Sequence, residues 1–121
     1  MNQRGAAGRI YLARLDQAPE DGRTVTLPET ATADLRLGTR ILFYELRGEG
    51  DSARGFLSGW GEVERIAAAE GVTTVLLRAY TPFKRRIPFS ELRADPRREP
   101  DATVQLVSTE VFNLALAKAR R

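Results

Sequence analysis

The sequence predicts a small, mostly antiparallel β barrel of five to seven strands with one helix at its C-terminal end, which belongs to the mostly β, α+β class. Three observations support this fold class. About six short segments rich in β-forming residues follow one another along the 121-residue chain, separated by turn signals. One convincing amphipathic helix occurs, and it comes last. The regular alternation of strands and helices that a parallel sheet requires is missing. The length fits one domain, residues 1–121.

The first third of the chain contains two predicted strands and a short helical segment. Residues 9–15 (RIYLARL) and 24–27 (TVTL) have the β-branched and aromatic composition of strands. Between them, residues 17–23 include proline, aspartate and glycine, which mark a loop. Residues 30–37 are expected to form one or two helical turns that stop at Gly38.

The clearest predicted strand covers residues 40–46 (RILFYEL). Apolar side chains alternate onto both of its faces, so we expect the strand to be covered on both sides. One face carries Ile41 and Phe43, and the other carries Leu42, Tyr44 and Leu46.

Two further strands follow a glycine-rich loop at residues 47–55. In residues 56–66 a glycine stands on each side of Trp60, and glycines inside a strand indicate a bulge or a close approach of another backbone. A turn then leads into residues 72–80 (VTTVLLRAY), which again have apolar residues on both faces.

The last third contains an edge segment, a final strand and the helix. Prolines bracket residues 85–89, which restricts this segment to an edge because proline cannot donate to a central ladder. Residues 103–107 form the last predicted strand. Ser108 or Thr109 then caps a helix that ends in basic residues. The apolar stripe expected to pack on the sheet is Val111, Phe112, Ala115, Leu116 and Ala119.

The amino-acid inventory excludes most familiar catalytic groups. There is no cysteine and no histidine, so thiol nucleophiles, disulfides, histidine-based acid–base catalysis and Cys/His zinc sites are ruled out. We expect neither a cofactor nor a metal ion. No apolar run approaches the length of a membrane span, and the N-terminal residues lack a secretory hydrophobic region. We therefore expect a cytoplasmic protein with no membrane partner.

The positive charge is nearly all arginine and is unevenly placed. The net charge is +3, with 17 arginines and two lysines. Residues 80–98 hold six basic and two acidic side chains, whereas the rest of the chain holds 13 and 14. Proteins bind single-stranded or loop RNA with cations that contact the phosphates and with neighbouring aromatic rings on which the bases stack. The alternative is a solvated edge whose aromatic residues fill the core. The candidate contacts are Tyr80, Phe83, Lys84, Arg85, Arg86 and Arg93.

Trp60 is a second candidate for base binding. It is the only tryptophan, and its flanking glycines leave the ring unshielded by neighbouring side chains. With Tyr44 it is expected to form one wall of a base-stacking pocket, with one face open to a ligand. The alternative is that both rings fill the core.

Four runs of residues carry a resemblance to a known family. They are GTRILFY (38–44), GWGEVERI (59–66), YTPF (80–83) and RIPFSEL (86–92). Their glycine and aromatic spacing resembles the PUA-like superfamily, and in particular its EVE and ASCH branches. The Trp-rich opening common in EVE domains and the G-x-K-x-x-E-x-R signature of ASCH domains are absent.

This resemblance implies a six-stranded pseudobarrel that binds RNA, or a modified nucleobase flipped into a mouth of the barrel, without catalysis of its own. Two alternatives stay open. One is a small ASCH-like amidohydrolase acting on a nucleobase-like amide, with Lys84 as base or nucleophile near Thr81 and Glu91. The other is an accessory domain whose basic stretch docks on an acidic protein partner.

Overall fold

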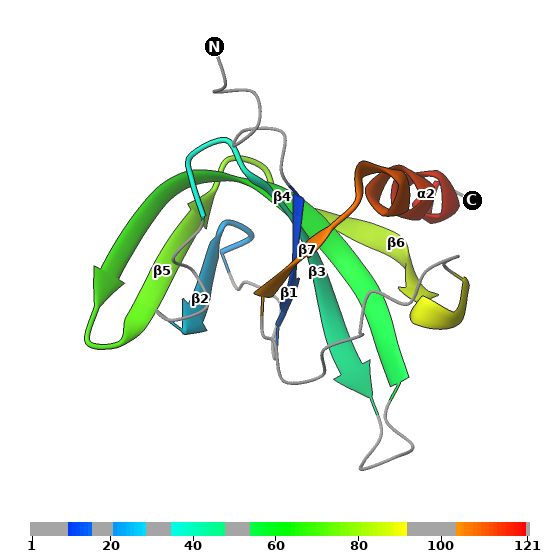
Figure 1. Cartoon of the computed structure of the whole chain (residues 1–121), viewed down its shortest axis with the longest axis horizontal. Helices are drawn as coiled ribbons and strands as arrows, with labels where there is room; N and C mark the ends of the chain where they lie inside the picture. Colours follow the sequence, from blue (N-terminus) through cyan, green and yellow to red (C-terminus); the bar gives the residue numbers. More distant parts are fainter. Residues whose placement is uncertain (1–9, 16–20, 29–34, 48–53, 92–103, 121) are drawn as a thin grey trace.

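The computed structural model describes residues 10–15, 21–28, 35–47, 54–91 and 104–120, and shows a strongly bent sheet with a helix beside it (Figure 1). The fold is mostly β with an α-helix at its C-terminal end, as the sequence predicts. The elements are β1 (Ile10–Arg14), β2 (Thr24–Pro28), β3 (Arg40–Arg47), β4 (Arg54–Ala69), β5 (Val72–Leu77), β6 (Thr81–Pro88), the 3-10 turn η3 (Phe89–Glu91), β7 (Val104–Val107) and α2 (Thr109–Ala119).

The seven strands of the described ranges join in one sheet. Their order is β2-β5-β4-β3-β1-β7, and β6 pairs with β4 beside this path. The β1–β3 pairing is parallel and the others are antiparallel. The prediction of five to seven mainly antiparallel strands is confirmed. The pairings among the described strands leave the sheet open rather than closing it into a full barrel.

The strand β3 is covered on both faces, as its alternating pattern predicts. Leu42 and Tyr44 belong to the core cluster that includes α2, whereas Ile41 and Phe43 belong to the cluster that includes β2 and β5. Leu46 departs from the prediction, because it is 39% exposed. Its cross-strand partner is a glycine, Gly55, which offers no side chain to cover it.

The strand β4 is the longest and changes partners along its length, arching across the molecule in Figure 1. Residues 54–62 pair with β3, and residues 63–69 pair with β5. Register shifts bend it, one of them between Leu57 and Gly59 opposite β6. The predicted close backbone approach is confirmed at Gly59, where a Cβ would lie 2.8 Å from the carbonyl oxygen of Thr81 and 3.1 Å from the Cα of Pro82.

The segment that follows β5 differs from the prediction. β5 ends at Leu77 rather than at residue 80, and pairing with β4 resumes only at Thr81, opposite Trp60. The edge strand predicted at residues 85–89 therefore begins earlier and includes both prolines. Within the described parts of the chain β6 pairs with β4 alone, so its outer edge has no ladder that needs proline N–H groups.

The helix α2 begins and packs as predicted. The Ser108 hydroxyl accepts a hydrogen bond from the N–H of Val111 at 3.1 Å, which caps the first turn. The stripe facing the sheet is buried or partly buried: Val111, Phe112 and Ala115 are buried, and Leu116 and Ala119 pack beside them. Of the helical segment predicted at residues 30–37, residues 30–34 lie outside the described ranges. The described residues 35–37 are not helical, so the prediction is wrong there, and Gly38 instead adopts a φ of +85° in the turn that leads into β3.

Candidate functional site

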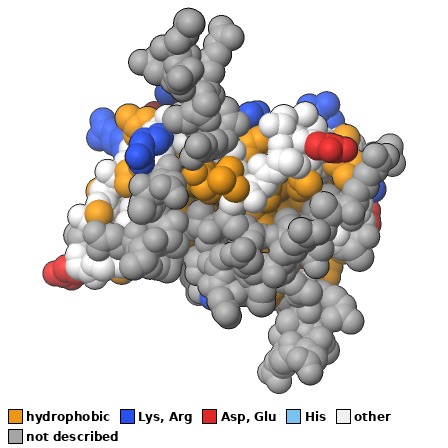
Figure 2. Space-filling model, viewed as in Figure 1, with side chains coloured by type: hydrophobic (Ala, Val, Ile, Leu, Met, Phe, Trp, Pro, Cys, Tyr) orange, Lys and Arg blue, Asp and Glu red, His pale blue; other side chains and the backbone are white. Residues whose placement is uncertain are grey.

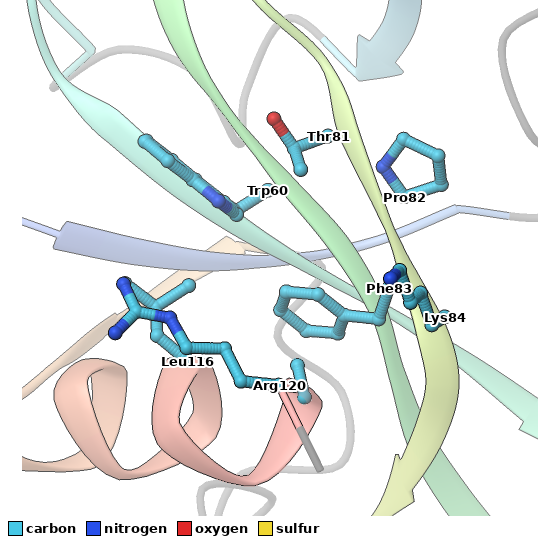
Figure 3. A pocket seen from close by; sticks show the side chains of 8 residues that line it. Trp60, Thr81, Pro82, Phe83, Lys84, Leu116 and Arg120 are labelled. Carbon is cyan, nitrogen blue, oxygen red and sulfur yellow. The ribbon is translucent and has the colours of Figure 1, made fainter.

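A cavity of about 350 Å³ lies between the end of α2 and the strands β4 and β6, and is called here the α2–β6 cavity. In Figure 3, Trp60 and Phe83 come from the sheet, and Leu116 and Arg120 come from the helix on the other side. Its volume is within the range of small-molecule sites. The lining residues are Trp60, Thr81, Pro82, Phe83, Lys84, Leu116, Ala119 and Arg120.

Trp60 is held in place by the helix while it borders the cavity. Its ring meets that of Phe112 edge-on, with centroids 5.4 Å apart and an interplanar angle of 86°. Phe112 is in turn covered by the guanidinium of Arg40, 4.9 Å from the ring centroid. Trp60 is half-buried. One part of the indole is thus fixed in the core and the rest borders open space, in agreement with the expectation that Trp60 lies beside a cleft.

The charges around the α2–β6 cavity are positive. Lys84 and Arg120 both line it and are exposed. Neither forms an ion pair with a carboxylate in the described ranges. Among the described residues, no Asp or Glu lines it. Arg120 also follows the last turn of α2, where a cation offsets the negative end of the helix dipole. A ligand with an aromatic ring and a negative charge fits this combination of groups.

A second cavity, of about 190 Å³, lies beside the first and is called here the Tyr80 cavity. Three consecutive residues of β6, Pro82, Phe83 and Lys84, line both cavities. The remaining lining is more polar than that of the α2–β6 cavity. It consists of Leu15, Glu45, Ser58, Tyr80 and Arg86.

Tyr80 connects the Tyr80 cavity to the core. Its ring packs against Phe43 with centroids 5.9 Å apart. Burial raises the pKa of the phenol, while a hydrogen bond with Ser58 opposes that shift. The hydroxyl therefore stays protonated at neutral pH and can donate a hydrogen bond. Tyr80 thus borders a cavity, although not the one that Trp60 borders.

The predicted pair Arg85 and Arg86 does not point to a single phosphate site. Arg85 is held by both oxygens of Glu91, at 3.0 and 3.1 Å, and this pairing lowers the pKa of Glu91. Arg86 pairs through its Nε with Glu45. The two arginines are neighbours on a strand and therefore extend to opposite sides, which separates them. Arg85 lines neither cavity, whereas Arg86 lines the Tyr80 cavity.

Tyr44 is a correction to the predicted stacking wall. It is only 5% exposed, and its ring packs against Phe89 with centroids 5.4 Å apart. It also lines neither cavity, and the residue opposite Trp60 in the ladder is Leu42. Tyr44 is a core residue. Arg93, the last of the predicted contacts, lies outside the described residues.

The alternative catalytic set is only partly brought together. Thr81 and Lys84 line the α2–β6 cavity, as a shared site would require. Glu91 does not line it, since its carboxylate binds Arg85 and lies 3.8 Å from the amine of Lys118. The three groups thus do not face one cavity in this structure.

The helix contributes site residues that the sequence patterns did not identify. Arg120, Leu116 and Ala119 complete one side of the α2–β6 cavity. The apolar stripe and the basic end of the helix were visible in the sequence. These features alone do not predict which strand lies next to the end of the helix. On the face drawn in Figure 2, the coloured Lys and Arg side chains lie at several separate places, most of them along the upper rim.

Comparisons with known proteins support the fold and leave the activity open. No protein-family model matches the chain, and no curated protein matches it. The crystal structure of protein Atu2648 from Agrobacterium tumefaciens is similar, with a TM-score of 0.61, 16% sequence identity and coverage of 92% of each chain. At this identity the likeness concerns the fold alone.

Within the described ranges, no helix is long and apolar enough to cross a membrane.

Proposed function

We propose that the protein is a PUA-like domain that binds single-stranded RNA, or a modified base within it, without catalysis of its own. An unstacked base occupies the α2–β6 cavity. The backbone phosphates beside that base contact Lys84 and Arg120. Sequence-specific RNA recognition generally targets unpaired bases that can be splayed out onto aromatic side chains, which favours this class of ligand.

The observation that carries the proposal is the make-up of the α2–β6 cavity. Two aromatic side chains, Trp60 and Phe83, border the same space as two cations, and no carboxylate of the described part of the chain lines it. Stacking on an aromatic ring and neutralisation of phosphate are the two main contributions to binding of single strands. The edge-on contact of Trp60 with Phe112 fixes the ring before a ligand arrives, which lowers the entropic cost of stacking.

Binding can be tested by fluorescence anisotropy with a fluorescein-labelled heptauridine at increasing salt. Two phosphate contacts predict that log K falls with log salt at a slope of about −1.4, from about 0.7 per contact on a single strand. Lys84→Ala should reduce the slope by about 0.7, because it removes one contact. Arg65→Ala is the matched control, since Arg65 is an exposed cation of β4 that lines neither cavity. It should leave the slope unchanged.

Stacking is tested separately through Trp60. Trp60→Ala should weaken heptauridine binding by about 1–3 kcal/mol with little change in the salt slope, since it removes a stacking surface and no charge. In the parent protein, binding should change the emission of this single tryptophan. Absence of binding to single-stranded RNA at low salt would overturn the proposal, and binding of duplex RNA or DNA alone would also contradict it. Lys84-dependent hydrolysis of small amides would favour the amidohydrolase instead, and binding of acidic proteins alone would favour the interaction domain.

A further inference from the structure

The two cavities on either side of Pro82, Phe83 and Lys84 differ in chemistry. The α2–β6 cavity offers mainly aromatic and aliphatic surface, on which any base can stack. The Tyr80 cavity offers a guanidinium, a carboxylate and two hydroxyls. Lys84 lines both, so one cation is available to the backbone between two neighbouring bases. A surface of this kind can bind one base by stacking, whatever its identity, and can distinguish the neighbouring base through hydrogen bonds to its edge.

We propose that the Tyr80 cavity is a guanine-reading subsite for the nucleotide next to the one stacked on Trp60. This inference rests on the proposed function. The reading group is Arg86, and Glu45 acts as its positioning residue. The subsite adds sequence preference to a site whose other contacts are made with the backbone and with the face of a base.

The geometry of Arg86 supports this assignment. Its ion pair with Glu45 uses Nε, which restrains one edge of the guanidinium and leaves the opposite edge free of Glu45. The two terminal nitrogens make no further hydrogen bond with the described residues. They form the planar fork that binds two acceptors at once. The Arg86 side chain is 52% exposed, so a base can reach this fork without displacing the ion pair.

Guanine is the base that matches the fork. Its O6 and N7 atoms are adjacent acceptors, and a bidentate arginine contact to them is the commonest specific contact to a base. Adenine presents an amino donor beside N7, which opposes a second donor, and pyrimidines have no N7. Ser58 and Tyr80 add hydroxyls at the edge of the same cavity. The Tyr80 phenol is protonated at neutral pH, as burial only raises its pKa further, so it can donate to a further acceptor of the ligand.

The test compares two fluorescein-labelled heptamers, U7 and the same strand with one central guanosine, by anisotropy at fixed salt. We expect the parent protein to bind the guanosine strand about fivefold or more tightly than U7, the lower end of the discrimination by a bidentate contact. Arg86→Lys keeps the charge and removes the fork, so it should abolish the preference while the affinity for U7 changes little. Arg85→Lys is the matched control, because Arg85 is the adjacent residue and lines neither cavity; the preference should persist.

A second variant tests the positioning role. Glu45→Gln should reduce the preference for the guanosine strand without lowering the affinity for U7, because it loosens Arg86 and removes no positive charge. Equal binding of the two strands by the parent, or a preference that survives Arg86→Lys, overturns the guanine subsite. In either case a loss of U7 binding in Trp60→Ala would still support the proposed function. Failure of both heptamers to bind would instead remove the proposed function itself.

Discussion

The two halves of β4 build different parts of the molecule. Its first half pairs with β3 and β6 and lies against the cluster that includes α2. Its second half pairs with β5, with β2 beyond, and leaves four successive side chains, residues 65–68, exposed. Both halves have buried cores, yet both cavities adjoin the first half. Both cavities thus lie where the edge strand β6 meets the first half of β4, and α2 closes one side of the α2–β6 cavity.

The largest effect is expected from truncating each core. Phe112→Ala should destabilise the fold by about 3–5 kcal/mol and Leu77→Ala by about 2–5 kcal/mol, because each leaves a cavity in a fully buried cluster. Urea unfolding followed by circular dichroism measures both. Before unfolding, only Phe112→Ala should shift the emission of Trp60, since it removes the edge-on ring contact. An equal shift in Leu77→Ala would mean that the two halves are not independent.

A smaller difference is expected between two glycines. Gly59→Ala places a Cβ against the β6 backbone and should cost about 1–3 kcal/mol by overpacking. Gly71, in the turn between β4 and β5, has a φ of +79° and open space around it, so Gly71→Ala should cost about 1 kcal/mol through backbone strain alone. Only Gly59→Ala should also weaken heptauridine binding, because β6 must shift. Thermal unfolding and anisotropy together check this, and unchanged binding in Gly59→Ala would contradict it.

The smallest effect concerns acid stability in the second half. The Asp21 carboxylate accepts hydrogen bonds from the hydroxyl and N–H of Thr24 and from the N–H of Arg23, which lowers its pKa from 3.8 to about 2. Because the folded pKa lies below the unfolded one, its stabilising effect is complete above pH 3.8 and is lost as the pH falls through about 2. In Asp21→Asn, the free energy of unfolding should depend less on pH between pH 4 and about 2 than it does in the parent protein. Carboxyl NMR titration measures the pKa directly, and an ordinary value for Asp21 would refute the turn's role.

Local patterns were sufficient for the strands and the helix. Alternation in residues 40–46 predicted a strand covered on both faces, and the serine before an apolar stripe predicted the start of α2. The parallel pairing of β1 with β3 could not be predicted from either segment alone. The alternation within a strand indicates which of its faces is apolar, but it does not indicate which other strand will pair with it. The prolines correctly predicted that β6 is an edge strand among the described strands. They did not predict how long β6 is.

The site was harder to predict than the fold. Trp60, Phe83 and Lys84 stand in suggestive sequence contexts, and they do meet in one cavity. The ion pairs of Arg85 and Arg86 depend on which carboxylates the fold places opposite them, and Glu45 is distant in sequence. Arg120 enters the cavity only because of the direction in which α2 crosses the sheet. Charge and aromatic content thus predict a class of ligand, while the choice between neighbouring arginines requires the tertiary structure.

The position of β7 beside β1 has a consequence for the order in which the chain assembles during synthesis. β3, β4 and β5 are consecutive antiparallel neighbours and can pair as soon as each has emerged from the ribosome. The partner of β1 across its other edge comes from residues 104–107, and α2 comes later still. The Phe112 ring that packs edge-on against Trp60 belongs to this late segment. The α2–β6 cavity is therefore completed only after Leu116, Ala119 and Arg120 have been synthesised, when β3, β4 and β5 have already emerged.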